Sequence, residues 1–535
     1  MTCFWRIAMV PAIAWLAGCA TDALRSAPQR PDLPWQPNVS STGELLPGRA
    51  SGDKDTAAST YILPVNADIA PRPPASQIDA GHAYGLAELI DIAESSNPKT
   101  RQAWDLSRDA ALAVGITRAA YLPRLTASVV GGYNYSSNEA DNPVLSGGNA
   151  SLQPINQTIN SFSNAGGENT VRNAGSGEVQ TLSMEWLLFD FGERDARVAA
   201  AQQDQIASNV GFTAAHQAVI YSVAVAFYAH AAACARVEFV QQAYANATLV
   251  QKAASARLRR SQGTIQDVAQ VNQVVAQDRL RLVQAEGAVD DRYVDLLTAI
   301  GISPTTRLTT VNVGGRRLRI EDAQPTDAMI EHAVARRPDV LAAYAWAKAA
   351  RDNVTAARSA FLPKIFVTGN VTYSTGQLSL NSVPSVDSST SPTLNLSSKT
   401  FSGLILGGIT IPIFDGGLRA AALKLAENRV DATDAGLHES TDDAVEQIVT
   451  AGNALRTAIE AYSAASALVQ ASHTSFDAAL TVYRSGEGSV TQATIAQSAL
   501  LDAEIVKSDA YYATLIAAVG LAFADGELGD AASLP

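Results

Sequence analysis

The sequence predicts a mixed α/β membrane protein: each chain contributes four strands to a β-barrel, and long coiled-coil helices continue that barrel. Three observations predict this class. The chain contains two internal repeats, each repeat has two segments of alternating apolar and polar residues, and each has a proline-free, alanine-rich stretch of about 68 residues. Repeats of this length determine the architecture, because every copy must form the same supersecondary unit.

The two repeats align without a gap over residues 86–136 and 326–376, at a constant offset of 240 residues. Further along, at an offset of 225, Phe189-Asp190 matches Phe414-Asp415. The predicted divisions are a lipoprotein signal peptide at 1–18, an acylated tether at 19–82, repeat 1 at 83–301, an inter-repeat equatorial segment at 302–325, repeat 2 at 326–523 and a C-terminal tail at 524–535.

The N-terminus predicts a lipid anchor. After Arg6, residues 7–17 form an apolar stretch that is too short to span a bilayer. It ends in Leu16-Ala17-Gly18-Cys19, which resembles the bacterial lipobox, so Cys19 is the expected lipid-attachment residue. An ordinary signal peptide with a chance cysteine is the alternative. No aspartate follows the cysteine, which by analogy with enterobacterial lipoproteins favours the outer membrane. Several acyl chains anchor a protein stably where one does not.

The segment 19–82 differs from the rest of the chain in its prolines, which exclude a continuous helix. An extended tether along the body of the protein and a disordered linker both fit this composition. Trp35 and Tyr61 are candidate anchors for the tether. Beyond the signal peptide no segment has 18 consecutive apolar residues, so we expect any membrane crossing to use strands of a closed barrel.

The strand candidates alternate with a period of two, which is typical of half-buried strands. They lie at about 122–136, 179–190, 362–375 and 401–414. In the first, Leu125, Ala127 and Val129 alternate with Thr126 and Ser128. Apolar-out, polar-in segments of about ten residues are the pattern of outer-membrane barrels. A soluble antiparallel sheet with one wet face is the alternative. The polar stretches 137–177 and 377–399 between paired strands are the expected extracellular loops.

Four strands cannot close a barrel, because the smallest bacterial barrels have about eight. Two chains would give eight strands, but side chains fill a barrel of that size and leave no channel. Three chains would give a 12-stranded barrel with a shared pore. The sequence therefore favours a trimer.

The long helices are expected at about 193–260 and 418–484, each roughly 100 Å long at 1.5 Å per residue. Shorter helices, expected at 98–119 and 266–300 and again at 338–359 and 489–522, would stack in pairs to match them. Asp190 and Asp415 precede the long helices and are expected to cap them. A stripe with alternating spacings of three and four indicates a coiled-coil seam. Its members are Val445, Ile448, Gly452, Leu455, Ile459, Tyr462, Ser466 and Val469.

These features together resemble the TolC family of outer-membrane efflux and secretion ducts, in particular its lipoprotein branch. The resemblance covers roughly residues 83–523. It depends on the duplicated Ala-Tyr121-Leu122-Pro123 and Ala-Phe361-Leu362-Pro363 motifs, the duplicated Phe-Asp turns and the duplicated helix tips. It implies a homotrimer with a 12-stranded barrel on a 12-helix periplasmic tunnel. It also implies two partners, a periplasmic adaptor (membrane fusion protein) and an inner-membrane transporter.

The resemblance assigns the gate to the helix tips, expected at about 259–267 and 484–492. Some members carry two aspartate rings at positions that correspond here to Gln492 and Ile495, so the acidic gate is not reproduced. The gate candidates are Asp267, Arg484, Gln492 and Ile495, and Arg484 with Asp267 is expected to hold adjacent tips together. The adaptor-contact candidates are Arg259, Arg260, Gly263, Gly486 and Gly488. The arginines also suit a solvated helix end, where cations complement the dipole.

The expected function is therefore an exit duct in the outer membrane of a Gram-negative bacterium, anchored by lipid and extending into the periplasm. A non-porous lipoprotein scaffold of coiled coils is the alternative, and it leaves the four alternating strands unexplained. No enzyme is expected, because the six histidines are scattered and no hydrolase, nucleotide-binding or Cys-x-x-Cys motif occurs. No cofactor or metal is expected. The net charge of −13 argues against binding nucleic acid, and Cys234 is expected to be a small buried residue.

Overall fold

The computed structural model describes residues 37–49, 62–70, 78–139, 170–311, 327–376, 379–380, 394–395, 400–485 and 487–529. The predicted signal peptide with Cys19, most of the tether including Trp35 and Tyr61, most of both polar loops and Gly486 lie outside these residues. The chain divides into two units, Met1–Ala83 with Ile302–Thr310 and Tyr84–Gly301 with Val311–Pro535.

Within the first unit, part of the predicted tether forms a small antiparallel hairpin. Strand β1 (Pro37–Val39) pairs with β2 (Leu45–Arg49). Gly43 lies in the turn with a φ of +90°, and a Cβ atom there would lie 1.9 Å from the carbonyl oxygen of Val65. Only glycine fits this position, because it combines a left-handed conformation with a close backbone approach.

The second unit carries the same order of elements twice. The first copy contains α2 (Leu86–Ser96), α3 (Pro98–Ala119), β4 (Arg124–Glu139), β5 (Thr170–Phe189), α5 (Glu193–Arg259) and α6 (Ile265–Ile300). The second contains α7 (Asp327–Arg336), α8 (Pro338–Ser359), β7 (Lys364–Gly376), β10 (Thr400–Thr410), α9 (Leu418–Ser485) and α10 (Val490–Ala524). The short strands are β3 (Ala83–Tyr84), β6 (Thr309–Thr310), β8 (Ser379–Leu380) and β9 (Leu394–Asn395).

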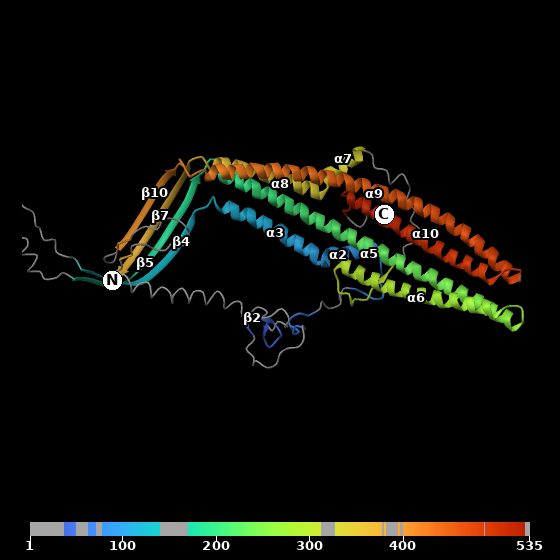
Figure 1. The fold of residues 1–535 in the computed structure, drawn as a ribbon. Coiled ribbons are helices and arrows are strands. Elements are labelled where there is room, and N and C mark those ends of the chain that lie inside the picture. The colour runs from blue at the N-terminus through green and yellow to red at the C-terminus, as the bar shows by residue number, and fades with distance from the viewer. Residues whose placement is uncertain are drawn as a thin grey trace, which may run out of the picture. The chain divides into compact units, whose positions relative to one another are not determined.

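Four long strands form one antiparallel sheet in the order β10-β7-β5-β4 (Figure 1). Strand β5 begins at Thr170, earlier than expected, because β4 continues to Glu139 and the two pair to their ends. Strand β10 ends at Thr410 rather than near residue 414. Pro412 explains this early end, because proline has no amide hydrogen to donate to the ladder.

The four helices that adjoin the sheet repeat the order of its strands. Helix α3 packs on α5, α5 on α8, and α8 on α9. Farther from the sheet, α6 packs along α5, and α10 packs along α9 and α5 (Figure 1). The boundaries of α3 and α8 agree with the prediction, since each begins at a proline in its first turn.

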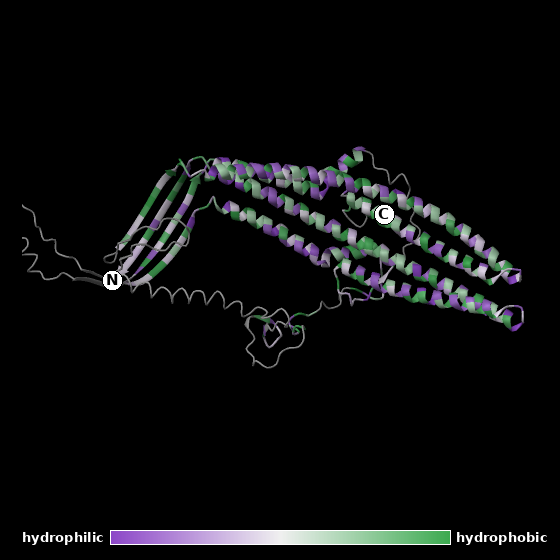
Figure 2. Cartoon of the chain, viewed as in Figure 1, coloured by the Kyte–Doolittle hydropathy of each residue, from purple (hydrophilic) through white to green (hydrophobic). Residues whose placement is uncertain are grey.

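The predicted seam of α9 is buried at its centre. Ile448, Leu455 and Ile459 are buried, whereas Val445 is exposed and Ala444 takes its place against the neighbouring helices. Helices α5 and α10 are also long and apolar enough to cross a membrane by length and composition. A core helix of a soluble protein passes the same test, and both helices carry hydrophilic residues along much of their length (Figure 2).

Candidate functional site

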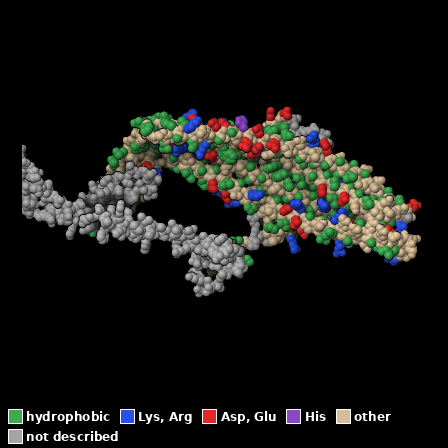
Figure 3. Space-filling model, viewed as in Figure 1, with side chains coloured by type: hydrophobic (Ala, Val, Ile, Leu, Met, Phe, Trp, Pro, Cys, Tyr) green, Lys and Arg blue, Asp and Glu red, His purple; other side chains and the backbone are tan. Residues whose placement is uncertain are grey.

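The sheet separates apolar from polar side chains across all four strands. In the observed register, Leu182 of β5 lies between Ala127 of β4 and Val371 of β7, and Gly403 of β10 lies beyond Val371. Leu125, Val129 and Ile405 on this same face are exposed. A sheet with a broad apolar face left open to its surroundings fits a lipid-facing surface. Apolar side chains gather over the sheet and its junction with the helices (Figure 3).

The opposite face of the sheet is mainly polar. One row runs Ser128, Thr181, Thr372, Ser402, and the next pairs Thr126 with Ser183 and then Asn370. Strand β10 departs from the pattern, because Leu404 and Leu406 place apolar side chains on this face. The alternation predicted for β4 and β7 is therefore present in the structure, whereas β10 follows it less regularly.

Both edges of this sheet are open. Among the described residues, β4 pairs only with β5 and β10 pairs only with β7. Each edge strand therefore has one side that pairs with no other strand in the described part of the chain. Unpaired backbone N–H and C=O groups are costly in hydrocarbon, and a sheet that spans a membrane must close on itself or on other copies.

An ion pair that the sequence reasoning missed fixes the turn from sheet to helix in each copy. Arg194 Nε donates to Asp190 Oδ2 at 3.0 Å, and both side chains are buried. The corresponding pair, Arg419 and Asp415, is bonded at 2.9 Å but is about a third exposed. The signal was present in the sequence, because both turns read Asp-x-Gly-x-Arg.

The expected capping by Asp190 needs a correction. Gly192, with a φ of +93°, occupies the N-cap position of α5, and Asp190 lies two residues earlier. The Asp190 carboxylate still accepts the backbone N–H of Arg194 at 2.9 Å, and Asp415 accepts that of Arg419 at 3.1 Å. Each aspartate therefore caps its helix from outside, because a left-handed glycine turns the chain between the aspartate and the first turn of the helix.

Arg194 also ties the turn to the end of α3. Its guanidinium donates to the carbonyl oxygens of Leu187, Leu188 and Ala120 at 2.6, 3.1 and 3.1 Å. It also lies 4.7 Å from the centre of the Tyr121 ring. Burial, together with a hydrogen bond to Asp195, raises the pKa of Tyr121 to about 12. This phenol therefore stays protonated at physiological pH.

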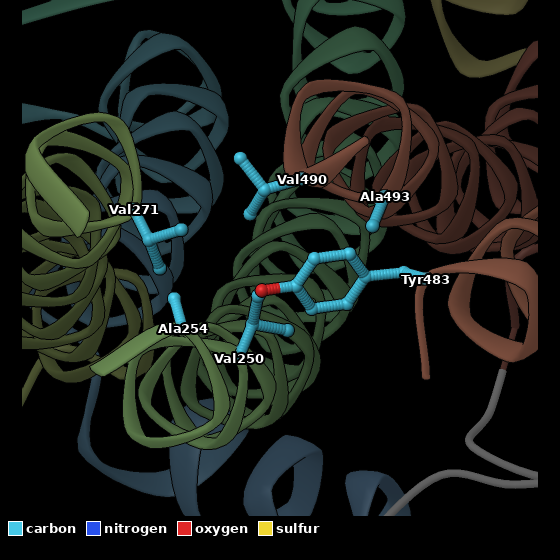
Figure 4. Close-up of a cluster of buried hydrophobic side chains, with 6 residues drawn as sticks. All are labelled: Val250, Ala254, Val271, Tyr483, Val490 and Ala493. Carbon is cyan, nitrogen blue, oxygen red and sulfur yellow. The ribbon is translucent and has the colours of Figure 1, made fainter. Parts of the chain in front are cut away.

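The other end of the helices carries the predicted tips, and a cluster of buried side chains joins them. Helices α5, α6, α9 and α10 all contribute. The members are Val250, Ala254, Val271, Tyr483, Val490 and Ala493 (Figure 4). The Tyr483 ring points toward Val250 (Figure 4). The two tips therefore share one small core instead of ending as separate hairpins.

Arg257 supplies the polar tie between the tips, and the sequence reasoning missed it. Its guanidinium donates to the carbonyl oxygen of Tyr483 at 2.9 Å and to that of Gln262 at 3.3 Å. It also lies 5.1 Å from the centre of the Tyr483 ring. Burial raises the pKa of Tyr483, and Arg257 opposes that shift. Helical spacing could have revealed this residue, because Arg257 follows Val250 and Ala254 on one face of α5.

Asp267 and Arg484 do not meet within the chain. Asp267 forms a capping box with Thr264: its carboxylate accepts the Thr264 N–H at 2.9 Å, and its own N–H donates to the Thr264 hydroxyl at 3.1 Å. Arg484 lies exposed in the last turn of α9, without an ion pair to any described residue. Any bridge between these two residues would have to join separate copies of the chain.

Gln492 and Ile495 lie exposed on the first turns of α10. Ile495 lines a hollow of about 410 Å³ between α6 and α10, together with Gln270, Thr494 and Asp502. Deeper along α6, Asp278 is buried, and its Oδ1 lies 3.6 Å from Arg281 Nη1. Burial raises the pKa of Asp278, Arg281 lowers it, and Asp502 raises it further.

Local packing explains why glycine occupies the tip positions 263 and 488. A Cβ atom on Gly263 would lie 3.3 Å from Arg257 Cβ, and one on Gly488 would lie 3.0 Å from Val482 Cγ1 and 3.1 Å from Tyr483 N. Each glycine lets the chain return close to the last turn of the long helix. Arg259 and Arg260 are exposed beside them. Gly486 lies outside the described residues.

Among the described residues, no group of three or more His, Cys, Asp or Glu side chains could hold a metal ion. Cys234 is half-buried, and its Sγ lies 3.7 Å from His230 Nε2. Burial raises the pKa of the Cys234 thiol, so the thiol is a weak nucleophile at neutral pH.

Comparisons with known proteins agree with this arrangement. Protein CyaE of Bordetella pertussis is 28% identical over 465 residues, which cover 85% of this chain and 86% of CyaE. Outer membrane protein OprJ of Pseudomonas aeruginosa is 29% identical over 416 residues, or 75% of each chain. The Campylobacter jejuni CmeC outer membrane channel superposes with a TM-score of 0.66 at 19% identity, covering 86% of this chain and 90% of CmeC.

The model of the outer membrane efflux protein family matches residues 89–302 and 329–527, which is most of the second unit. Its two matched segments correspond to the two copies of the element order described above. The chain therefore belongs to the outer membrane efflux protein family, the TolC family that the duplicated motifs resemble.

Proposed function

We propose that this chain is one subunit of a homotrimeric exit duct, in which three copies close a 12-stranded barrel in the outer membrane. The observation that carries the proposal is the sheet, which has one apolar face, one mainly polar face and two open edges. Pairing β10 of one copy with β4 of the next is a head-to-tail contact, and such contacts generate a ring when the rotation between copies closes. Twelve strands leave room for a water-filled lumen lined by the polar face.

Four rods per chain, α3, α5, α8 and α9, leave the sheet in strand order, so three copies would continue the barrel as a helical tunnel. The duct would pass substrates from an inner-membrane transporter and a periplasmic adaptor to the exterior. Arg259, Arg260, Gly263, Gly486 and Gly488 at the tips are the proposed adaptor contacts.

We also propose that Gln492 and Ile495 narrow the resting tunnel. Apolar side chains that converge on a three-fold axis exclude water without burying charge, and Ile495 is an exposed apolar residue at the tip. Arg484 and Asp267 of neighbouring copies are the proposed bridge between adjacent tips. Arg257 and Tyr483 tie the two tips within each copy.

Light scattering of the detergent-solubilised protein, combined with planar-bilayer recording, tests the main proposal. A trimer with discrete conductance steps is the expected result. A trimer without conductance would favour the alternative, a non-porous coiled-coil scaffold. A protein that is monomeric in detergent and gives no conductance would refute the shared barrel.

The lipid anchor is a separate proposal, motivated by Leu16-Ala17-Gly18-Cys19. Mass spectrometry of the purified N-terminus should show Cys19 as the first residue, carrying acyl chains. Cys19→Ser should remove the acyl chains and leave the trimer assembled, because the barrel itself holds the protein in the membrane. An unmodified chain that starts at another residue would contradict the assignment.

A further inference from the structure

Two apolar strips lie at the open edges of the chain, just below the sheet. One strip, here called the β10 strip, follows β10 into α9; the other, the β4 strip, runs from α3 into β4. The β10 strip consists of Ile411, Ile413, Phe414, Leu418 and Leu425, and the β4 strip consists of Leu112, Ile116, Leu122 and Leu125. Their side chains are 54–94% exposed. That exposure to water is costly for apolar side chains that lie outside the membrane.

The backbone explains why the β10 strip is free. Thr410 is the last residue of β10, paired with Lys364, and Pro412 cannot continue the ladder. Ile411, Ile413 and Phe414 therefore leave the sheet before α9 begins at Leu418. Among the described residues the chain offers these side chains little cover, since Ile413 is 94% exposed and Phe414 88% exposed.

The β4 strip adjoins a matching hollow. A cavity of about 830 Å³ lies where α3 gives way to β4. It extends across the base of the sheet from the β4 edge, where Leu122, Pro123 and Arg124 line it, past Glu185 and Trp186 of β5. Phe366, Val367 and Thr368 of β7 line its far side. The cavity is large enough to receive an aromatic side chain.

The geometry of closure brings the two strips together. Within one copy, Arg124 lies in the same row as Leu406, through Glu185 and Thr368. Closing a barrel with strands tilted about 35–45° shifts the row by roughly four to six residues across four strands. Without a shift, Leu406 of one copy would lie opposite Arg124 of the next copy. With the shift, Leu406 lies opposite a residue about five positions further along β4. Because the strands are antiparallel, Thr410 then lies opposite about Leu125. The residues after Thr410 then face Leu122 and the cavity.

The helices match at the same level. Ile116 and Leu112 lie about 5 and 10 Å before the end of α3, at 1.5 Å per residue. Leu418 and Leu425 lie at the start of α9 and about 10 Å into it. Leu112 and Leu425 thus lie equally far, about 10 Å, from the sheet-facing ends of their helices.

We propose that the β10 strip of one copy docks onto the β4 strip of a second copy and forms an apolar clasp at the base of the barrel. Phe414 or Ile413 enters the cavity beside Leu122, and Leu425 meets Leu112. The inference rests on the proposed ring of three chains and adds the contact that holds neighbouring subunits below the strands. Bilayer lipid is the competing occupant, although it could reach only the part of the strips nearest the sheet.

Paired cysteines test the clasp in a Cys234→Ser background. Ile413→Cys with Leu122→Cys, and separately Leu425→Cys with Leu112→Cys, should each give a covalently closed trimer on oxidation, seen on a non-reducing gel. A bond within one chain is excluded at the sheet, because three strand spacings put the two edges about 14 Å apart and a disulfide needs Cα atoms within about 7 Å. It is excluded for the helix pair because α5 and α8 lie between α3 and α9. The matched control pairs Ile413→Cys with Leu106→Cys, which is also exposed on α3 but lies farther from the sheet.

The outcomes separate the clasp from the duct. Closed trimers from both test pairs and none from the control support the clasp. A conducting trimer in which neither test pair cross-links would overturn the clasp and leave the proposed function intact. Equal cross-linking of the control would also overturn it, because the contact would then be unspecific. A protein that is monomeric in detergent and gives no conductance would overturn both.

Discussion

Arg194 and Arg419 allow the same substitution to be compared in two copies of one turn. Arg194→Met should destabilise the protein far more than Arg419→Met. The Asp190–Arg194 pair is buried, and Arg194 also satisfies three backbone carbonyl oxygens. Removing one partner of a buried pair costs about 3–5 kcal/mol, because the other charge is left without compensation. The Asp415–Arg419 pair is about a third exposed, and solvent-screened pairs contribute about 0–1 kcal/mol.

Thermal unfolding of the detergent-solubilised protein, followed by circular dichroism, measures the difference. Arg194→Met should lower the Tm roughly three times as much as Arg419→Met, or more, in line with the two free-energy estimates. Adding Asp190→Asn to Arg194→Met should recover part of the loss, since it removes the uncompensated carboxylate. Equal losses from Arg194→Met and Arg419→Met, or no recovery in the double variant, would refute the reasoning from burial.

At the tips, Arg257→Ala should raise basal conductance in planar bilayers, because it removes two hydrogen bonds of a charged group, each worth about 1.5–3 kcal/mol; Lys252→Ala, an exposed residue of the same helix, should leave the conductance unchanged. Ile495→Asp should introduce cation block, and Arg484→Ala should raise conductance only modestly; identical recordings from both variants and the wild type would remove the gate from this turn. Asp278→Asn should raise the Tm at neutral pH. A raised folded-state pKa means that wild-type stability increases as pH falls through that pKa toward the ordinary value near 4. Asp278→Asn should lack the part of this stability increase that comes from Asp278. A Tm that depends on pH in the same way in the variant and the wild type would contradict the raised pKa of Asp278.

Regular elements were predictable because their signals are local. Pro98 and Pro338 mark the starts of α3 and α8, and Pro123 and Pro363 follow their ends, so the sequence determines these boundaries. Period-two alternation predicted the faces of β4 and β7. It did not predict the end of β10, which depends on where Pro412 interrupts pairing with β7.

The polar ties were harder to predict because they join residues far apart in sequence. Arg257 bonds to the carbonyl oxygen of Tyr483, and nothing near Arg257 reveals that partner. The ion pair of Arg194 was easier to predict, because its aspartate lies four residues away and the pattern recurs at Arg419. Its bond to the carbonyl oxygen of Ala120 required the fold. The cross-chain role of Asp267 stays a prediction, because its cap with Thr264 involves one chain alone.

The small size of the buried residues along α5 has a mechanical consequence. Many of them are alanines, including Ala243, Ala247 and Ala254 toward the tip. Each buries little apolar area, at about 25 cal/mol per Å², so cohesion between the rods is spread thinly along their length. The work of parting the rods therefore grows gradually with the length parted. A separation of the rods that starts at the helix tips can stop after a turn or two, while the rest of the helices and the distant sheet keep their packing.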